Sequence, residues 1–600
     1  MQLVDLKFLP GIDKQDSAYS AGDQRKYIDS DFVRFHYGKP ERWGGWQNLP
    51  NPNVTVVGAV RDTHSWIGLD GTRYLGLGTD RKLYIFSEGK VYDITPLRKT
   101  SSLTNPFATS SGSATVTVTD NAHQAEVGAF VTFDNGSSTN VVDGIDFNNE
   151  FEVLTVPTAN TSTDAKYQIN PGPTSSTYGY GWGTETWGAS TWDTPRSSSN
   201  VVVAARNWSL DNFGEDLIAT VLDGGTFIWD TSGGLATRAT ALSNAPTASR
   251  FSLVSTDTRH LLIFGTETTI GNTATQDDLL LRFSDREDAT DYTPVATNEA
   301  GSLRISDGSR IVGAVKSAGQ ILIWTDTSLH GLQFVGTPFT FGLRQLGANA
   351  GLIAQHAAIE VNGIAYWMSD NAFYLYDGVV KKMPCSVQDF VFDSISYTNK
   401  NDIAVGLNTA YNEIIWYYPS ANATQIDRAV AYNYLEGTWY TISLARTTWL
   451  GAYVYESPIA TEYSSSTTAN ASTILGLTAG ASFIYEHETG NNQADGTAIS
   501  AFLETGSVEI ADGDQLMSVS KLVPDFDNLT NTMTATLTLE QYPQSSSNVT
   551  TSGSITSTTE KINVRGRGRA VKIKYQTNTV DDTPWRLGSQ KLQIRPDGRR

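Results

Sequence analysis

The chain has 600 residues and carries 63 Asp and Glu against 43 Lys and Arg, which gives a formal net charge of −20. This length exceeds what one hydrophobic core organises, so we expect several domains or one large repeat architecture. Because Cys385 is the single cysteine, the chain can form neither an intrachain disulfide nor a multi-cysteine metal site. The sequence shows no secretory signal pattern and no run of eighteen apolar residues, so we expect no membrane-spanning segment.

The composition favours strands over helices. Charged residues make up only 18% of the chain, Gly numbers 52, and Ser, Thr and Asn are abundant. This balance is typical of many short strands with polar outer faces joined by tight turns. We therefore predict an all-β protein.

Residues 31–46 (DFVRFHYGKPERWGGW) form the first readable motif. Its residues 38–41 (GKPE) are of the types that make hairpin turns. Gly44 and Gly45 allow another stretch of backbone to approach closely, and Trp43 and Trp46 supply large packing anchors. We expect residues 1–50 to be a structural segment built around this hairpin.

A short aromatic-aliphatic run followed by a polar turn recurs along residues 51–104 and 171–500. The later runs start 60, 52 and 41 residues apart, close to the roughly 40–50 residues of one propeller blade. We predict a β-propeller, in which radial packing buries both faces of each sheet. A string of β-sandwiches is the alternative. The runs are 83–86 (LYIF), 227–229 (FIW), 261–264 (LLIF), 321–324 (ILIW), 373–376 (FYLY), 414–416 (IIW) and 483–485 (FIY).

The interval between the first two runs is too long for one blade. Residues 114–119, 130–133 and 151–156 are strand-like, so we predict a small β-domain inserted over residues 105–170. Beyond it, residues 178–192 interleave glycine with aromatic rings. This stretch is either a stacking platform for a sugar or base, or a loop that caps the propeller.

The C-terminal region, residues 501–600, has its own alternating runs at 508–510, 534–540, 561–564 and 570–575, which predict a β-sandwich. It also has its own charge. Residues 561–600 contain 11 Lys and Arg against 3 Asp and Glu, or +8, which leaves −28 on the first 560 residues. Such asymmetry indicates that the two parts face different partners.

No catalytic, cofactor-binding or metal-ligating residue stands out. Motifs for nucleotide binding, zinc proteases and serine hydrolases are missing from the sequence, and paired carboxylates are too common here to be specific. No two histidines lie within five residues of each other, so only the fold could assemble a metal site. We predict a non-enzymatic protein without cofactor. The histidines are His36, His64, His123, His260, His330, His356 and His487.

Both ends of the chain resemble the tail nozzle, or tail tubular, proteins of short-tailed bacteriophages. The N-terminal likeness lies in residues 8–12 (FLPGI) and 31–46, and the C-terminal likeness in residues 565–569 (RGRGR), 585–588 (WRLG) and 597–600 (DGRR). The middle of the chain is similar to these proteins only in its general pattern of short strands and turns. Alternatives to this reading are a receptor-binding adhesin or glycan-cleaving tailspike of a phage, and a cellular propeller scaffold.

The resemblance implies a virion tail protein that forms a ring, typically of six copies, below the portal and adaptor. It implies that the chain ends form one platform and that the propeller lies outside. An acidic lumen would let DNA pass without sequence-specific binding. The basic end would meet an acidic adaptor face or a neighbouring copy, with packaged DNA as the competing partner, and tail fibres are further candidate partners. The candidate assembly-interface residues are Arg34, Trp43, Trp46, Arg565, Arg567, Arg569, Trp585, Arg586, Arg599 and Arg600.

Overall fold

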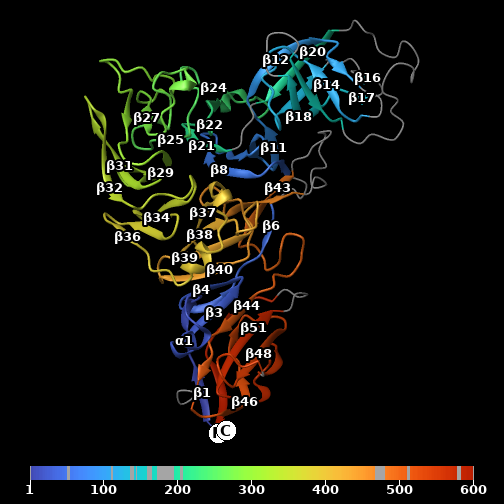
Figure 1. Ribbon diagram of the computed structural model, residues 1–600, viewed down its shortest axis with the longest axis vertical. Helices are drawn as coiled ribbons and strands as arrows, with labels where there is room; N and C mark the ends of the chain where they lie inside the picture. Colours follow the sequence, from blue (N-terminus) through green and yellow to red (C-terminus); the bar gives the residue numbers. More distant parts are fainter. Residues whose placement is uncertain are drawn as a thin grey trace.

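The computed structural model shows a nearly all-β molecule (Figure 1). A propeller fills the middle, a small inserted domain lies at one end, and a platform of strands from both chain ends forms the other end. The predicted fold class is thereby confirmed. The structure describes all residues except 1, 50–54, 110–112, 135–140, 143–144, 159–164, 172–194, 203–206, 466–479, 510–513, 547, 578–582 and 599–600.

In the described part of the chain, six four-stranded antiparallel sheets and one five-stranded sheet form the propeller, each numbered here as a blade in chain order. Blade 1 contains β8 (Val60–Ile67), β9 (Arg73–Thr79), β10 (Leu83–Ser87) and β11 (Lys90–Asp93). Blade 2 contains β21 (Trp208–Phe213), β22 (Asp216–Val221), β23 (Thr226–Trp229) and β24 (Thr240–Ala241). Blade 3 contains β25 (Phe251–Val254), β26 (Leu261–Phe264), β27 (Leu280–Phe283) and β28 (Gly301–Arg304).

The remaining blades follow the same pattern. Blade 4 contains β29 (Ile311–Ser317), β30 (Gln320–Thr325), β31 (Ser328–Gly336) and β32 (Thr340–Ala348). Blade 5 contains β33 (Ala358–Val361), β34 (Ile364–Met368), β35 (Phe373–Tyr376) and β36 (Val380–Lys382). Blade 6 contains β37 (Ala404–Asn408), β38 (Glu413–Tyr418), β39 (Arg428–Asn433) and β40 (Thr438–Ile442). Blade 7 begins with β41 (Thr448–Leu450), β42 (Ile459–Ser464) and β43 (Ala481–His487).

Each of the seven apolar runs lies in a different blade, always in its second or third strand. These central strands are covered on both faces by neighbouring blades, which is why they read as continuous apolar runs. Their spacing is irregular because some runs are second strands, such as β26, and others are third strands, such as β10.

The N-terminal region closes the ring of blades. β6 (Trp46–Asn48) pairs with β43, with Trp46 opposite His487, and β7 (Thr55–Val57) pairs with β43 as well. Residues 46–48 therefore belong to the propeller rather than to the platform segment predicted over 1–50. The sequence could not show this, because the pairing joins strands more than 430 residues apart.

The platform interleaves strands from the two chain ends in three sheets. The outer sheet has the order β1 (Gln2–Leu6), β53 (Gln590–Pro596), β46 (Met517–Val523), β50 (Ile562–Gly568). The central sheet has the order β2 (Leu9–Ile12), β3 (Lys26–Asp31), β44 (Phe502–Thr505), β51 (Ala570–Thr577), β48 (Met533–Glu540), β49 (Val549–Ile555), with β45 (Val508–Glu509) also on β51. The joint sheet has the order β4 (Val33–His36), β5 (Lys39–Arg42), β52 (Arg586–Leu587), β47 (Phe526–Asp527).

The hairpin predicted near residue 38 exists, but its turn is Tyr37–Gly38. Both residues have positive φ, 51° and 68°, the conformation that a two-residue hairpin turn needs. Lys39, Pro40 and Glu41 lie in strand β5 rather than in the turn. The helices are few and short: α1 (Ala18–Asp23), α2 (Gln388–Phe392) and the 3₁₀ turns Thr231–Gly233, Thr273–Thr275 and Tyr397–Asp402.

The inserted domain is wider than the predicted range 105–170. Its sheet has the order β12 (Leu97–Thr104), β20 (Pro195–Val202), β15 (Phe130–Asp134), β18 (Glu150–Thr158), β19 (Lys166–Ile169), β14 (Val116–Thr119), β13 (Phe107–Ala108). β16 (Val141–Val142) and β17 (Ile145–Asp146) form a separate pair. The boundary strands β12 and β20 pair with each other. They are rich in Ser and Thr, so their sequences read as polar linkers rather than as strands.

The inserted domain is fastened to blade 1 by a buried ion cluster. Lys82 has 2% of its surface exposed, and its Nζ lies 3.0 Å from an Asp93 oxygen and 2.7 Å from a Glu150 oxygen. Glu150 belongs to the insert and Lys82 to the blade. A buried lysine of this kind needs its carboxylate partners, so it fixes the insert at this point.

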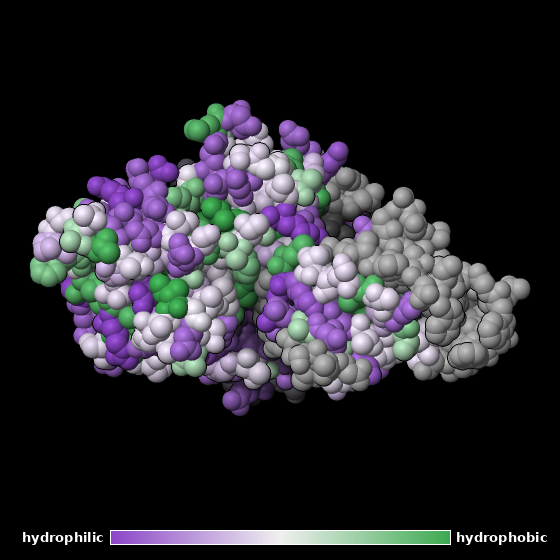
Figure 2. Space-filling model, turned by 90° about the horizontal axis from the view of Figure 1, so that it is seen from above, coloured by the Kyte–Doolittle hydropathy of each residue, from purple (hydrophilic) through white to green (hydrophobic). Residues whose placement is uncertain are grey.

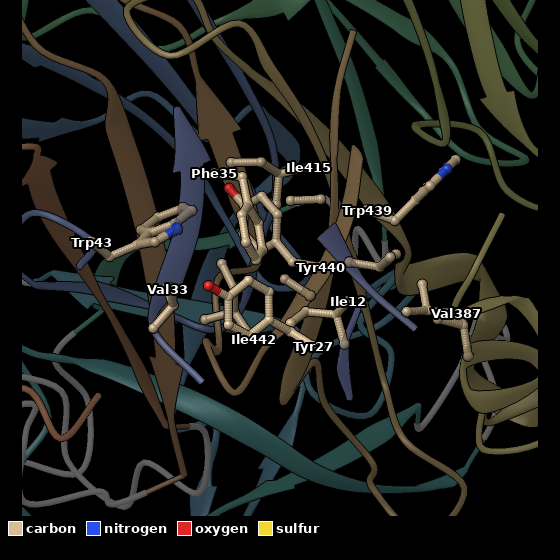
Figure 3. Packing of buried hydrophobic residues seen from close by; sticks show 14 of the residues in the cluster. Ile12, Tyr27, Val33, Phe35, Trp43, Val387, Ile415, Trp439, Tyr440 and Ile442 are labelled. Carbon is tan, nitrogen blue, oxygen red and sulfur yellow. The ribbon is translucent and has the colours of Figure 1, made fainter. Parts of the chain in front are cut away.

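The largest hydrophobic cluster joins the platform to blade 6 (Figure 3). Tyr27, Val33 and Phe35 of the platform pack with Tyr440 and Ile442 of β40, and all five are buried. The platform and the propeller therefore share one core. We call this contact region the joint.

Candidate assembly interface

Arg34 lies at the centre of the joint. It stands on β4 with none of its surface exposed, and its Nε is 3.5 Å from a Glu413 oxygen and its Nη2 2.5 Å from a Glu488 oxygen. The rings of Trp43 and Tyr411 cover the guanidinium, with centroids 4.4 and 3.6 Å from its carbon. Arginine stacks on aromatic faces and pairs with carboxylates at once, so one side chain ties β4 to two parts of the propeller.

The carboxylates of Glu413 and Glu488 contribute unequally to the ion pair with Arg34. Burial alone would lower the pKa of the Arg34 guanidinium, but Glu413 and Glu488 outweigh it and hold that pKa above its usual value. Burial raises the pKa of Glu413 to about 7, against the opposing effects of Arg34 and of the hydrogen bond donated by the Tyr440 hydroxyl. We assign the ion pair mainly to Glu488, whose oxygen is closer to the guanidinium.

A second buried arginine flanks the first. Arg446 is 1% exposed, donates through Nε to the His487 Nε2 at 2.9 Å and pairs with Glu462 at 2.6 Å. The ring of Trp46 stacks on His487 at 5.3 Å and lies under the Arg446 guanidinium at 4.8 Å. Burial, and then the two arginines, lower the pKa of His487 well below its usual value, so this histidine is neutral.

Close backbone contact at Gly44 and Gly45 is confirmed. A Cβ on Gly45 would lie 2.4 Å from the Asn492 carbonyl oxygen, and one on Gly44 would lie 2.4 Å from a Glu488 carboxylate oxygen. Such distances leave no room for a side chain. The Gly-Gly pair therefore lets the chain pass against the loop after β43 on its way from the platform into blade 7.

Trp585 and Arg586 also belong to the joint sheet. Trp585 is 3% exposed and meets Phe526 edge-on at 6.0 Å. Arg586 donates to the His36 carbonyl at 2.9 Å, and its Nε lies 3.6 Å from a Glu41 oxygen. These contacts tie the C-terminal strand β52 to the N-terminal hairpin.

The structure thus corrects one group of predicted interface residues. Arg34, Trp43, Trp46 and Trp585 are buried inside the chain and do not present an outer surface. The first three contact the propeller and hold it to the platform, whereas Trp585 packs on Phe526 within the platform. Arg586 is half-buried in the same joint. The sequence suggested an interface because large aromatic and arginine side chains suit both roles.

A second group does lie on the surface, on the outer sheet of the platform. Arg565 and Arg567 project from β50 on its exposed side, while Ile562 and Val564 point into the core. Arg567 pairs with Asp597 at 3.2 Å. Arg569 lies just after the end of β50, so it is not part of that strand's alternating exposed and buried positions. Its guanidinium donates to the Asp514 carbonyl at 2.8 Å and stacks over Tyr542 at 5.2 Å. Arg599 and Arg600 lie outside the described residues.

Neighbouring strands extend this basic surface. Lys591 and Arg595 are exposed on β53, and Ser518 of β46 stands directly between Arg595 and Arg567 in the register. We call Arg565, Arg567, Lys591 and Arg595 the basic sheet face. Adjacent cations on a flat sheet form a site for an acidic partner surface.

The residues that sequence reasoning missed are the acidic and histidine partners in the joint. Glu413, Glu488 and His487 carry no local signal, because they meet Arg34 and Trp46 only through the fold. The Glu488 contact spans 454 positions of the chain. Glu413 directly precedes an apolar run, but single acidic residues are too common in this sequence for that position to indicate a buried ion pair.

Other candidate sites offer little chemistry. Among the described residues, no group of three or more His, Cys, Asp or Glu is arranged to hold a metal ion, and no helix is long and apolar enough to cross a membrane. A cleft of about 50 Å³ between blades 3 and 4 is lined by hydroxyl groups, by apolar side chains that include Phe334 and Phe341, and by the charged Asp257 and Lys316. Burial raises the pKa of the Cys385 thiol to about 12, which leaves it unreactive. The Gly- and Trp-rich stretch 178–192 lies outside the described residues.

Comparisons with known proteins give only distant likenesses. No family model and no curated protein matches the chain. Among solved structures it is similar to BBS1N in complex with ARL6DN, at 12% identity over 63% of this chain and 94% of that chain, with a TM-score of 0.25. It is also similar to the Neurospora crassa Pan2 WD40 domain, at 9% identity over 74% and 95%, with a TM-score of 0.32. The order of strands in the seven sheets itself defines the propeller.

Proposed function

We propose that this chain is a non-enzymatic structural protein of a short-tailed phage tail. On this proposal it forms a nozzle ring, typically of six copies, below the head-to-tail connector. The ring closes the DNA channel in the virion and conducts the genome during ejection. The sequence likeness of the two chain ends to tail nozzle proteins motivates the proposal.

The observation that carries it is the way the two ends fold together. The segments that show the likeness come from opposite termini, yet they build one platform whose outer sheet bears exposed arginines. The rest of the chain is acidic. A basic sheet face on an acidic body suits a protein that binds an acidic partner at one end and repels DNA phosphates elsewhere.

Light scattering on the purified protein, alone and mixed with the connector of its virus, tests the proposal. We expect the mixture to contain a closed ring of this chain on the connector. A stable trimer that ignores the connector would contradict the proposal and would favour a tailspike or adhesin. A glycan array supplies the second readout, since a pure conduit binds no glycan.

Point variants are better suited to this test than a C-terminal truncation. Removing residues 565–600 would delete β51 and β53, which contribute buried residues such as Ile573 and Leu592 to the platform core. Arg565→Glu with Arg567→Glu changes only exposed side chains, so loss of the ring on the connector would report on this surface, whether it meets the connector or a neighbouring copy. A matched control is Lys382→Glu, an exposed cation at the end of β36 in blade 5.

A further inference from the structure

Exposed apolar side chains gather on one face of the propeller. In every blade, the connection between the first and second strands and that between the third and fourth strands lie at the same end of the sheet, because neighbouring strands are antiparallel. We call the residues in these connections, and up to two residues on either side of them, the turn face. The connections span residues 68–72, 88–89, 214–215, 230–239, 255–260, 284–300, 318–319, 337–339, 362–363, 377–379, 409–412, 434–437 and 451–458.

Nine large apolar side chains are exposed in the described part of the propeller, and eight of them lie on the turn face. The ninth, Tyr397, lies on the opposite face, in the connection between blades 5 and 6. Single exposed apolar residues need no explanation, but their concentration on one face does. The eight, with their exposed fractions, are Ile67 (54%), Leu69 (92%), Val295 (54%), Val335 (57%), Phe339 (76%), Val379 (63%), Leu435 (70%) and Tyr453 (67%).

The platform adds one more apolar residue to the same face. The Gly38 backbone N–H donates to the Glu436 carboxylate at 3.1 Å, and Glu436 lies in the third–fourth connection of blade 6. Tyr37, next to Gly38, is 77% exposed. Figure 2 looks from above onto the outer edge of the propeller rather than onto the turn face, and there hydrophobic and hydrophilic residues are intermixed. On the turn face, exposed apolar side chains beside charged ones are typical of a protein–protein contact surface.

The turn face is also strongly acidic, which restricts its partner. Its connections contain 13 Asp and Glu against three Lys and Arg, a net charge of −10. This sign disfavours nucleic acid and anionic lipid, both of which are negatively charged. It favours a protein surface that carries cations beside some apolar groups.

The chain itself carries such a surface at its other end. The basic sheet face has four exposed cations, and Leu3 of β1 is 55% exposed on the same sheet. Figure 1 shows β1 and β46 at the tip of the platform, far from the propeller, so one molecule cannot bring the two surfaces together. Complementary surfaces at different ends of one chain make a heterologous, head-to-tail contact, which generates a ring when it closes.

We propose that the acidic, apolar turn face of one copy binds the basic sheet face of a second copy. The proposal rests on the ring of the proposed function and names the surfaces that build it. Leu435, Phe339 and Tyr453 supply the apolar contact, and Arg565 and Arg567 of the second copy supply the charge.

Two differently tagged copies test the contact by co-purification and by sedimentation over a range of concentrations. We expect Phe339→Ser with Leu435→Ser to weaken self-association at least tenfold. The matched control is Val127→Ser, which removes an equally exposed apolar side chain from the inserted domain and leaves association unchanged. All of these side chains are exposed, so circular dichroism and the melting temperature should not change.

Charge exchange tests the pairing of the two surfaces. Arg565→Glu with Arg567→Glu should abolish self-association of the variant, because every copy then carries the same sign of charge on both surfaces. Adding Asp257→Lys and Glu456→Lys to the same chain should restore self-association, because both acids are exposed on the turn face. Loss without rescue, or self-association that ignores the Phe339 and Leu435 changes, overturns the inference. If the rings on the connector are intact in every variant, the proposed function stands and this contact is wrong; if the wild type forms no ring even with the connector, the proposed function fails.

Discussion

Arginines serve opposite purposes in two regions of this molecule. In the joint, Arg34 and Arg446 are at most 1% exposed and are surrounded by aromatic rings and carboxylates. On the basic sheet face, Arg565 and Arg567 point into solvent from a strand whose other side is core. The residue type is the same, so the backbone position alone decides whether an arginine holds the chain together or presents its charge at the surface.

The buried and the exposed arginines also differ in what they contribute to the free energy of folding. A buried arginine has lost its hydration and depends on its partners, so removing either side leaves an uncompensated charge. An exposed arginine keeps its water and contributes little to folding. The joint should therefore respond to mutation through stability, whereas the basic sheet face should respond through assembly.

The largest effect is expected from Arg34→Ala. It leaves Glu488 and Glu413 in the joint without a cation, which costs about 3–5 kcal/mol in comparable buried pairs. Urea unfolding followed by tryptophan fluorescence measures this loss, because Trp43, Trp46 and Trp449 lie in or beside the joint. Arg34→Met combined with Glu413→Gln and Glu488→Gln should regain most of the loss, since no lone charge remains. An unchanged midpoint for Arg34→Ala would show that the buried ion pair does not stabilise the joint.

A smaller loss is expected from Gly45→Ala. The new Cβ would lie 2.4 Å from the Asn492 carbonyl oxygen and 2.6 Å from its nitrogen, so the backbone of one segment must move. Forcing extra atoms into a packed site costs about 1–3 kcal/mol. Gly38→Ala is the matched control, since nothing lies within 4 Å of its Cβ position, although its φ of +68° adds some strain of its own. Equal melting temperatures for the two variants would contradict the close approach at Gly45.

The sequence predicted the fold class and the recurrence of apolar runs along the propeller, because central strands buried on both faces leave continuous hydrophobic segments. It could not predict blade closure by Trp46–Asn48, or the interleaving of β1 with β53, because those pairings join distant residues. The site was harder still. The motif that contains Arg34 and Trp43 stood out locally, but whether those side chains faced outward or into the joint depended on Glu413 and Glu488, which have no local signature.

Glu413 should give the joint a pH dependence. Its folded pKa is raised to about 7 from a usual 4.5, so the folded state holds a proton that the unfolded state has lost between these values. The associated stability is fully present below about pH 4.5 and is lost as the pH rises through 7. His487, with its lowered pKa, acts in the other direction and favours unfolding below about pH 6.5.

A comparison of the wild type with Glu413→Gln isolates the first of these effects. Gln mimics the protonated side chain, so the two proteins should unfold at the same urea concentration at pH 4, below the usual pKa of 4.5, and the variant should be the more stable one at pH 8. Urea midpoints at half-unit pH steps provide the measurement. The wild type being more stable at pH 8 would mean that Glu413 is the charged partner of Arg34, contrary to our assignment of that role to Glu488.

The smallest effect on folding is expected from Arg565→Ala with Arg567→Ala, and it completes the contrast with Arg34. Both side chains are exposed, and surface changes of this kind usually alter stability by less than about 0.5 kcal/mol. Arg567 does lose its ion pair with Asp597, but that pair is open to solvent and so is worth little. The melting temperature should therefore stay constant while self-association falls and becomes less sensitive to salt, since fewer charges are paired at the contact. If these variants melted as early as Arg34→Ala, the two classes of arginine would not differ, and the basic sheet face would have to be regarded as part of the fold.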